Sequence, residues 1–289
     1  MWLFIQSLIS GLLNGGVYAF AAVGLTLIYG VMNIVNFAHG SFLMWGMYFA
    51  YSAFVFWGID PYLSLIGGSI LFFLLGVGVQ KLLIRPVLNA PHHIQILLTI
   101  GLFLVMDNLA LILFSPDYRT IKVSYAESSI EFGSVLVNVP RLVAFLSAVI
   151  LSGVLFFFLK RTDVGKALRA ASEEKIGTRL VGVDVNLINA VAFGLGTACV
   201  GMAGIVLMPF FYVSPDVGFS FVLKTFVIVV MGGMGNFLGA LVCGLIIGIA
   251  ESLGELILPG SAKDILTYTV FIVVLLFKPQ GVLGQRKGI

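Results

Sequence analysis

Long apolar runs are the feature of this sequence that most restricts its fold. A helix needs about 20 mainly apolar residues to cross the roughly 30 Å hydrocarbon core of a bilayer. The chain is 60% hydrophobic and only 10% charged, whereas soluble domains carry about 25% charged residues. We therefore predict an all-α integral membrane protein, a polytopic helical bundle that forms one transmembrane domain over residues 1–289. Runs of suitable length cover residues 4–29, 41–58, 62–84, 94–114, 141–160, 187–208 and 236–257, and a shorter run covers 262–277.

The apolar stretch 221–231 (FVLKTFVIVVM) is too short for a full crossing and is followed by GGMGN. This pattern predicts a short or broken helix. A membrane protein tolerates such a break only where protein or a watery cavity covers the freed backbone groups. The stretch can either cross the bilayer or re-enter it on the same side.

The cations predict the orientation, because cytoplasmic loops of membrane proteins carry an excess of Lys and Arg. The richer set of cations follows the third span, the fifth span and the last span. We therefore expect the N-terminus outside and the C-terminus in the cytoplasm. This parity makes 221–233 a crossing and gives about nine crossings in total. The richer set is Lys81, Arg85, Lys160, Arg161, Lys166, Arg169, Lys175, Arg179, Lys278, Arg286 and Lys287, and the opposite set is Arg119, Lys122, Arg141, Lys224 and Lys263.

The longest external loop covers residues 115–140. Its segments IKVSY and SVLVNV alternate apolar and polar residues, which would suit a small β-hairpin. A faint likeness between residues 11–27 and 186–202 reflects either an internal repeat, as is common in transporters, or the general similarity of glycine-rich helices. Cys199 and Cys243 lie in apolar runs, so we expect neither a disulfide nor a metal site. The sparse charges argue against a nucleic-acid surface.

The segment GVMNIVNFAHGSF (30–42) places two amides and an imidazole between apolar runs. These groups either hold helices together, at about 0.6 kcal/mol per hydrogen bond in membranes, or line a transport route at a broken helix. The cation distribution puts the segment at the cytoplasmic end of the first span, where its glycines would open the helix. We therefore expect a gate or a helix-joining turn first and a solute contact second. The candidate residues are Asn33, Asn36, His39 and Ser41.

Asp107 is the best candidate for a buried carboxylate, since it lies in the apolar run LFLVMDNLALILF. One interpretation is that it contacts a substrate ammonium or serves as a proton site. The other is that it takes part in an interhelical hydrogen bond that Asn108 shares. The GGMGN stretch either presents backbone groups at helix ends to a solute or allows close helix packing. Glu251 and Glu255 share a helix face, where they reach the membrane interface or an external partner. The GGMGN candidates are Gly232, Gly233, Gly235 and Asn236.

The segment 162–185 is the longest polar run on the inner side. Positions 164–180 predict a helix with apolar contacts from residues such as Leu168 and Ile176. Gly177 and Gly182 break its regularity. The helix is either an ordinary solvated loop helix or a docking helix for a cytoplasmic partner, and its spacing does not separate the two.

Four stretches, in order, carry a resemblance that covers nearly the whole chain. The run GLTLIYGVMNIVNFAHGSFLMWGMY (24–48) resembles the signature of permease subunits from bacterial branched-chain amino acid ABC importers. The stretches TDVGKALRAASEEKIGTRLVGVDV (162–185), VIVVMGGMGNFLGALVCGLIIGIAE (227–251) and LLFKPQGVLG (275–284) resemble the same family. Members of this family often have an acidic residue where this chain has Ser41, which puts any role of that charge in doubt here.

The resemblance implies a multi-pass protein of the bacterial inner membrane that pairs with a second, related permease subunit. It also implies two cytoplasmic ATPase subunits, an extracytoplasmic solute-binding protein and alternating access. The helix at 165–180, within the coupling segment 162–185, would transmit ATP-driven closure. The coupling residues implied are Gly165, Arg169, Glu173, Glu174, Arg179 and Gly182.

The solute implied is a branched-chain or related small amino acid, and relatives that import urea, short amides or other amino acids leave an alternative open. The chain has no phosphate-binding loop of the G-x-x-x-x-G-K-[ST] type, so we expect ATP to be used by a partner and no cofactor to be bound by this chain. A stand-alone channel or secondary transporter is a further alternative. An intramembrane enzyme is not favoured, since no nucleophile motif or metal-spaced His pair lies within a span.

Overall fold

The structure, a computed structural model, describes residues 2–132, 135–258 and 260–284. Arg286 and Lys287, two of the cations used to predict orientation, lie outside the described residues. Helices dominate the described chain, which confirms the all-α prediction. The helices are α1 (Trp2–Met32), α2 (His39–Trp57), α3 (Pro61–Val79), the π-helical η1 (Gln80–Ile84), α4 (Arg85–Val87), α5 (His92–Phe114), α6 (Val139–Arg161), α7 (Asp163–Glu173), α8 (Lys175–Leu180), α9 (Val185–Leu207), α10 (Val217–Gly232), α11 (Phe237–Ile257), the 3-10 helical η2 (Gly260–Ala262) and α12 (Lys263–Phe277).

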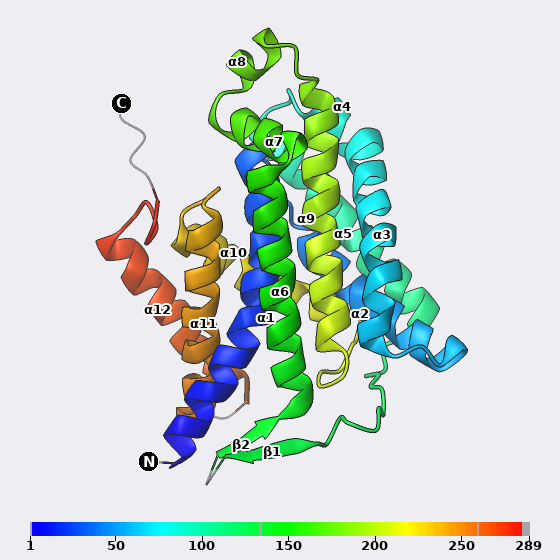
Figure 1. Cartoon of the computed structure of the whole chain (residues 1–289), viewed down its shortest axis with the longest axis vertical. Helices are drawn as coiled ribbons and strands as arrows, with labels where there is room; N and C mark the ends of the chain where they lie inside the picture. The colour runs from blue at the N-terminus through cyan, green and yellow to red at the C-terminus, as the bar shows by residue number, and fades with distance from the viewer. Residues whose placement is uncertain (1, 133–134, 259, 285–289) are drawn as a thin grey trace.

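The helices run up and down between two ends of the bundle (Figure 1). One end carries α7 and α8 and is called the α7–α8 end. The other carries the strands β1 (Ser129–Phe132) and β2 (Val135–Asn138) and is called the hairpin end. The direction alternates through α1, α2, α3, α5, α6, α9, α10, α11 and α12, which agrees with the predicted nine crossings.

Within the described part of the chain, six stretches are long and apolar enough to cross a membrane alone, namely α1, α3 to α4, α5, α6, α9 and α11. The 16 residues of α10 and the 15 residues of α12 give lengths of only about 24 and 22 Å at 1.5 Å per residue. Both are shorter than the roughly 30 Å hydrocarbon core. The prediction of a short helix after residue 220 is therefore confirmed, and it is an unbroken helix up to Gly232.

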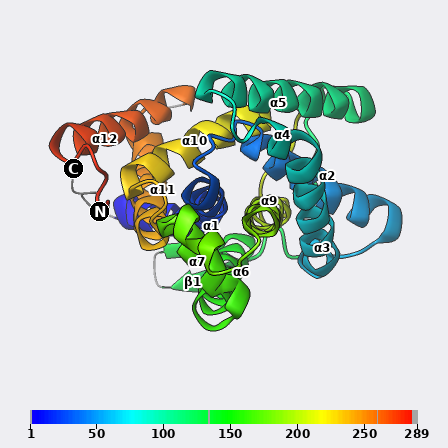
Figure 2. The same cartoon turned by 90° about the horizontal axis from the view of Figure 1, so that it is seen from above.

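α1 and α9 lie at the centre of the bundle, with the other long helices around them (Figure 2). Glycine lets their backbones approach closely. A β-carbon added at Gly24 would lie 2.5 Å from the Gly196 carbonyl oxygen, and one added at Gly196 would lie 2.6 Å from the Gly24 oxygen. Small residues are the usual means of close helix packing in membranes.

Two sets of four helices have the same order and matching contacts but opposite directions. α1 is followed by α2, α3 and α5, and α9 is followed by α10, α11 and α12. α3 packs on α9, α11 packs on α1, and α2 meets α10 where Gly40 and Gly218 touch backbone to backbone. This arrangement favours the interpretation that residues 11–27 and 186–202 belong to an inverted repeat.

The hairpin forms, but only its second strand comes from a segment that the alternation suggested, since β2 lies within SVLVNV (134–139). β1 and β2 pair antiparallel with Ser129 opposite Asn138. IKVSY (121–125) is not a strand, because Ile121 and Val123 are buried against the bundle core instead of pairing with a second strand. Gln6 of α1 hydrogen-bonds both backbone groups of Leu136, which fixes the hairpin to the first helix.

Candidate functional site

The polar segment after α1 is a true break in helical structure. α1 ends at Met32, Asn33 has a left-handed backbone (φ +56°), and α2 begins at His39. Asparagine adopts this conformation more readily than most residues. The prediction that glycines open the helix is wrong, because Gly30 and Gly40 are both helical. Gly40 instead packs against the Gly218 carbonyl oxygen.

The break begins at the end of the first span, as predicted, but the chain then folds back along α1 into the bundle instead of turning directly into the second span. His39 Nε2 lies 3.0 Å from the carbonyl oxygen of Ala21, eleven residues before the end of α1, or about 16 Å along a helix axis. Thr99 of α5 donates to the carbonyl oxygen of Val35 at 3.1 Å. α2 therefore begins inside the bundle. An extended path and a helical path through IVNFA (34–38) bury similar apolar side chains, so the sequence pattern does not separate them.

The segment satisfies part of its own backbone. The side-chain Oδ1 atom of Asn36 accepts a hydrogen bond from the Ala38 amide at 3.2 Å. The backbone carbonyl of Asn36 accepts one from the His39 amide at 3.3 Å. Ile34, Asn36 and His39 are fully buried, as irregular backbone inside a membrane protein must be. Asn36 Nδ2 and His39 Nδ1 are buried without a hydrogen-bond partner among the described residues.

Two predicted residues far apart in sequence meet between α2 and α5. The hydroxyl of Ser41 donates to Asp107 Oδ1 at 2.6 Å, and the Trp45 indole donates to the Met106 carbonyl at 3.2 Å. Asn108 does not share the Asp107 carboxylate, since its amide donates to the Leu104 carbonyl at 2.8 Å. Where the family resemblance expects an acid, Ser41 thus supplies the donor for a carboxylate on the neighbouring helix.

The GGMGN stretch forms the turn between α10 and α11 at the α7–α8 end. Gly233 (φ +96°) and Gly235 (φ +87°) are left-handed, and Asn236 caps α11 by accepting from the Gly239 amide at 2.9 Å. A β-carbon at Gly232 would lie 2.5 Å from the Gly239 carbonyl carbon. Close packing therefore explains these glycines better than a helix end that faces a solute.

The chain after α12 closes over this turn. The Val282 amide donates to the Met231 carbonyl at 2.7 Å, and the Asn236 side-chain amide donates to the Leu283 carbonyl at 2.6 Å. The two motifs GGMGN and PQGVLG thus form one structural unit.

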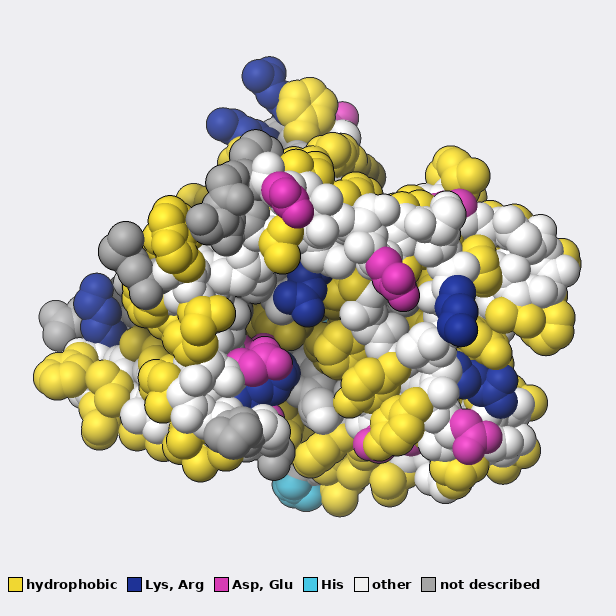
Figure 3. Space-filling view, turned by 90° about the horizontal axis from the view of Figure 1, so that it is seen from below, with side chains coloured by type: hydrophobic (Ala, Val, Ile, Leu, Met, Phe, Trp, Pro, Cys, Tyr) yellow, Lys and Arg dark blue, Asp and Glu magenta, His cyan; other side chains and the backbone are white. Residues whose placement is uncertain are grey.

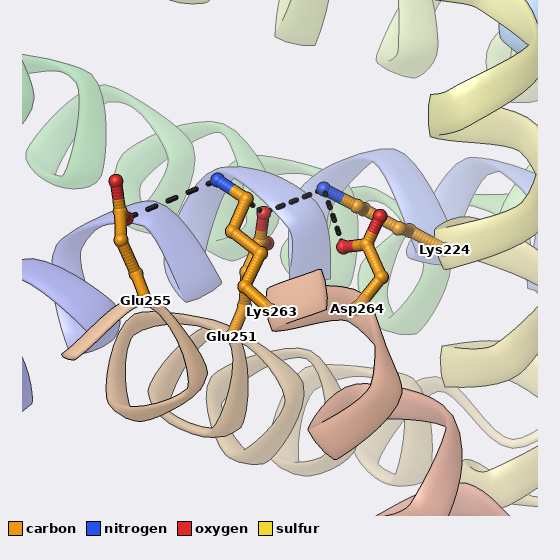
Figure 4. Close-up of polar contacts among 5 residues, drawn as sticks. All are labelled: Lys224, Glu251, Glu255, Lys263 and Asp264. Carbon is orange, nitrogen blue, oxygen red and sulfur yellow. Dashed lines mark hydrogen bonds and ion pairs between the residues drawn. The ribbon is translucent and has the colours of Figure 1, made fainter. Parts of the chain in front are cut away.

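An ion-pair cluster joins α10, α11 and α12 (Figure 4). Lys224 Nζ lies 2.6 Å from Glu251 Oε1, and Lys263 Nζ lies 3.5 Å from the same oxygen. Asp264 and Glu255 lie at the rim, each 3.9 Å from a lysine. The side chains of Lys224 and Glu251 are only 12% and 8% exposed.

The sequence reasoning missed this cluster. Glu251 is more deeply buried than Asp107, which was predicted as the best buried carboxylate. Glu251 also does not reach a surface, as both alternatives for the Glu251 and Glu255 pair assumed, whereas Glu255 is exposed. The available signals were Lys224 alone in an apolar run and the spacing of Glu251 and Glu255.

The polar segment 162–185 projects from the α7–α8 end as two short helices (Figure 1). Thr162 caps α7 by accepting from the Gly165 amide at 3.0 Å, and Leu168 and Ala171 pack against the bundle. The predicted single helix over 164–180 is wrong. The break lies at Glu174 rather than at Gly177, because Glu174 has extended backbone and its carboxylate caps α8 at the Ile176 amide, 3.0 Å away.

Most of the other residues of this segment are exposed, although Thr178 is buried. Ile176, Leu180 and Val181 are 70%, 83% and 79% exposed, and the Lys166 ammonium, 2.9 Å from Asp163, lowers the pKa of that carboxyl by hydrogen bonding. Gly182 turns the chain between α8 and α9 with φ +85°.

α7 shares a cavity with two other predicted elements. The cavity measures about 360 Å³ and lies between α1, α6, α7 and the α10–α11 turn. Arg169 and Glu173 line it together with Gly30 and Gly235. The predicted coupling residues Arg169 and Glu173 therefore face the end of α1 and the glycine turn, whereas Arg179 and Gly182 lie farther out on α8 and after it.

Buried breaks, intramembrane ion pairs and a protruding amphipathic element in a bundle of apolar helices define a multi-pass membrane transport protein. A family model described as the permease component of branched-chain amino acid transport systems matches residues 7–275. The chain belongs to this family of permease components.

Individual relatives agree with the family match. The high-affinity branched-chain amino acid transport system permease protein BraD of Pseudomonas aeruginosa is 30% identical over 98% of this chain and 96% of its own length. The corresponding protein LivH of Escherichia coli K12 has the same identity and coverage. The permease protein LivM of the same organism is 27% identical over 49% of this chain and 33% of its own. No solved structure matches the chain.

The buried ion pair gives a stability prediction. Lys224→Met should lower the free energy of unfolding by about 3–5 kcal/mol, because it leaves the Glu251 carboxylate buried without its closest partner. The double variant Lys224→Met/Glu251→Leu should recover most of this loss. Thermal unfolding of the purified protein in detergent measures both. Lys166→Met, which removes the exposed pair with Asp163, is the control and should unfold like the wild type. A double variant as unstable as the single one would contradict the prediction.

Proposed function

We propose that the chain is the membrane-spanning subunit of an ATP-driven importer that moves branched-chain or related small amino acids into the cell by alternating access. The family match over residues 7–275 carries this proposal. The names of BraD and LivH, which describe branched-chain amino acid transport, support the solute class.

In this proposal the protein lies in a bacterial inner membrane with its α7–α8 end in the cytoplasm. The N-terminus and the hairpin then face outside, and the C-terminus lies inside. Cation placement supports this orientation, since the Lys and Arg in the last turn of α6 and in α7 and α8 gather at one end. These cations are Lys160, Arg161, Lys166, Arg169, Lys175 and Arg179.

Two cytoplasmic ATPase subunits would dock at the α7–α8 element. The exposed apolar side chains Ile176, Leu180 and Val181 on a small charged projection support this role, because apolar residues exposed together mark interaction sites. ATP is used by these partners and not by this chain, which has no phosphate-binding loop. Arg169 and Glu173 of α7 face the end of α1 and the α10–α11 turn across one cavity. Movement of α7 would therefore change its contacts with both of these elements.

A second, related permease subunit would complete the pore, and a solute-binding protein would deliver solute at the hairpin end. The similarity of the chain to both LivH and LivM of one organism supports a pair of related permeases. Import of urea, short amides or other amino acids by the same machine is the alternative solute class, and a stand-alone channel or secondary transporter is the alternative mechanism.

Uptake by the reconstituted system tests this function. The permease pair in proteoliposomes, with its ATPase subunits and binding protein, should accumulate labelled leucine only when ATP is present. Vesicles without the ATPase subunits should accumulate none, because this chain has no energy source of its own. Leucine uptake without the ATPase subunits would contradict the proposal, and uptake of urea or acetamide but not leucine would replace the solute class.

The coupling segment gives a second prediction. Gly182→Val should reduce leucine uptake per ATP hydrolysed by roughly tenfold, since a β-branched residue disfavours the left-handed backbone at φ +85°. Gly182→Asn should retain most coupling, because Asn tolerates this conformation. Glu173→Gln should also uncouple. Gly153→Val, at a glycine with open space around it, is the matched control. Normal coupling in both Gly182→Val and Glu173→Gln would contradict the assignment.

A further inference from the structure

A polar cavity opens among the helices at the hairpin end. It measures about 230 Å³, several times the roughly 30 Å³ that a water molecule occupies in the liquid. Its walls come from α1, the start of α6, the end of α9, α11 and the start of α12. The face that carries it is hollowed and shows basic and acidic side chains close together (Figure 3). No residue predicted from the sequence as a pathway residue lines this cavity.

One wall offers hydrogen-bond acceptors without partners. Glu251 uses Oε1 for both Lys224 and Lys263, whereas its Oε2 atom is buried and has no partner in good hydrogen-bond geometry among the described residues. The Tyr18 side chain, which also lines the cavity, lies beside this carboxylate. Asn14 Oδ1, on α1, is likewise buried and without a hydrogen-bond partner among the described residues. A buried acceptor left unpaired is costly, so the Asn14 and Glu251 side chains, which line the cavity through other atoms, would gain a partner by turning toward a ligand that donates hydrogen bonds. The negative charge of Glu251 favours a cationic donor such as an ammonium group.

Another wall offers a cation. Arg141, at the start of α6, lines the cavity, and its guanidinium lies 5.9 Å from the Phe210 ring centre. Within the described part of the chain, no carboxylate lies within 4.0 Å of it. A guanidinium matches the two oxygens of a carboxylate with parallel hydrogen bonds. The cavity is therefore lined by an unpaired cation and by a glutamate that has one unpaired carboxylate oxygen.

The remaining wall is apolar. Leu207, Phe210 and Phe211 line it, and aliphatic side chains lose water favourably against such a surface. A free amino acid has the matching set of groups, namely an ammonium, a carboxylate and a side chain. Neutral amides such as urea lack the two charges that these walls would pair.

We propose that this cavity binds the zwitterion of an aliphatic amino acid. The ammonium group occupies the Glu251 Oε2 and Asn14 Oδ1 side, the carboxylate pairs with Arg141, and the aliphatic side chain lies against Leu207 and Phe210. Lys224 and Lys263 position the Glu251 carboxylate by holding its other oxygen. The inference rests on the proposed function and deepens it, since it places a solute site at the end where solute enters.

Direct binding tests the site. Nanodiscs that carry the complete permease and ATPase assembly, without the binding protein, are titrated with leucine, and saturation-transfer NMR gives the Kd. Arg141→Gln and Asn14→Leu should each raise the Kd by about tenfold or more, the loss expected for a hydrogen bond to a charged group. Asn14→Leu removes an unpaired acceptor and keeps the size of the side chain, so it should not lower thermal stability.

Analogues and matched controls identify the roles. 3-Methylbutylamine is leucine without its carboxylate. The wild type should prefer leucine over this amine, and Arg141→Gln should bind the two equally. Lys122→Gln and Glu127→Gln change exposed charges in the loop before the hairpin, outside the cavity, and should leave the leucine Kd unchanged.

A wild-type Kd in both Arg141→Gln and Asn14→Leu would overturn the proposal. So would the absence of leucine binding by an assembly that transports leucine. Uptake by the complete system, measured in parallel, separates this failure from failure of the proposed function: a wild-type system that imports no amino acid would refute the function itself. Normal uptake with unchanged binding in the variants would refute only the site.

Discussion

The interior of a bilayer contains no water that could satisfy free backbone groups, and the structure depends on how this chain meets that constraint. It contains two irregular stretches, 33–38 and 208–216, that follow α1 and α9. Protein covers much of each stretch, as the burial of Asn36, Val213 and Ser214 shows, whereas Asn33 and Tyr212 are exposed. α1 and α9 meet through Gly24 and Gly196 at the centre of the bundle. The irregular stretches that follow these two helices are tolerated because the surrounding helices enclose them.

The same arrangement creates short helices that begin inside the bundle. α2 starts beside Ala21 of α1, and its second residue touches the second residue of α10. Polar side chains collect where these helices meet their neighbours. Ser41 pairs with Asp107 on one side, and Lys224 pairs with Glu251 on the other. Helices that begin inside the bundle could be displaced without unravelling a continuous span, as the alternating access proposed above would require.

Much of this fold follows from the sequence because bilayer thickness sets the length of apolar runs. The spans, their alternation and the short helix before GGMGN needed no knowledge of packing. The path of residues 33–38 could not be predicted without knowledge of packing. Ile34 and Ala38 would be equally buried in a helix or in an irregular segment that folds back along α1. The break at Glu174 was hidden for a similar reason: a Glu that caps the following helix looks in sequence like any other helical Glu.

Among the functional residues too, those that belong to a sequence motif were predicted, whereas those brought together only by packing were not. Segments recognised by motif, such as 30–42 and 162–185, were found, although their local geometry was not. The Lys224–Glu251 pair was missed because its partners are 27 residues apart and meet only through the packing of α10 on α11. Arg141 was counted as an ordinary loop cation, and only the folded chain shows the cavity that it lines.

The central claim is that the α7–α8 end receives the ATPase subunits, and site-directed crosslinking tests it most directly. The native Cys199 and Cys243 are buried, so a cysteine placed at the exposed Leu180 provides a single reactive thiol. A short bifunctional reagent should link Leu180→Cys to an ATPase subunit in the assembled complex. Leu136→Cys, on the exposed hairpin at the opposite end, should give no such product. A crosslink from position 136 and none from position 180 would contradict both the orientation and the coupling role.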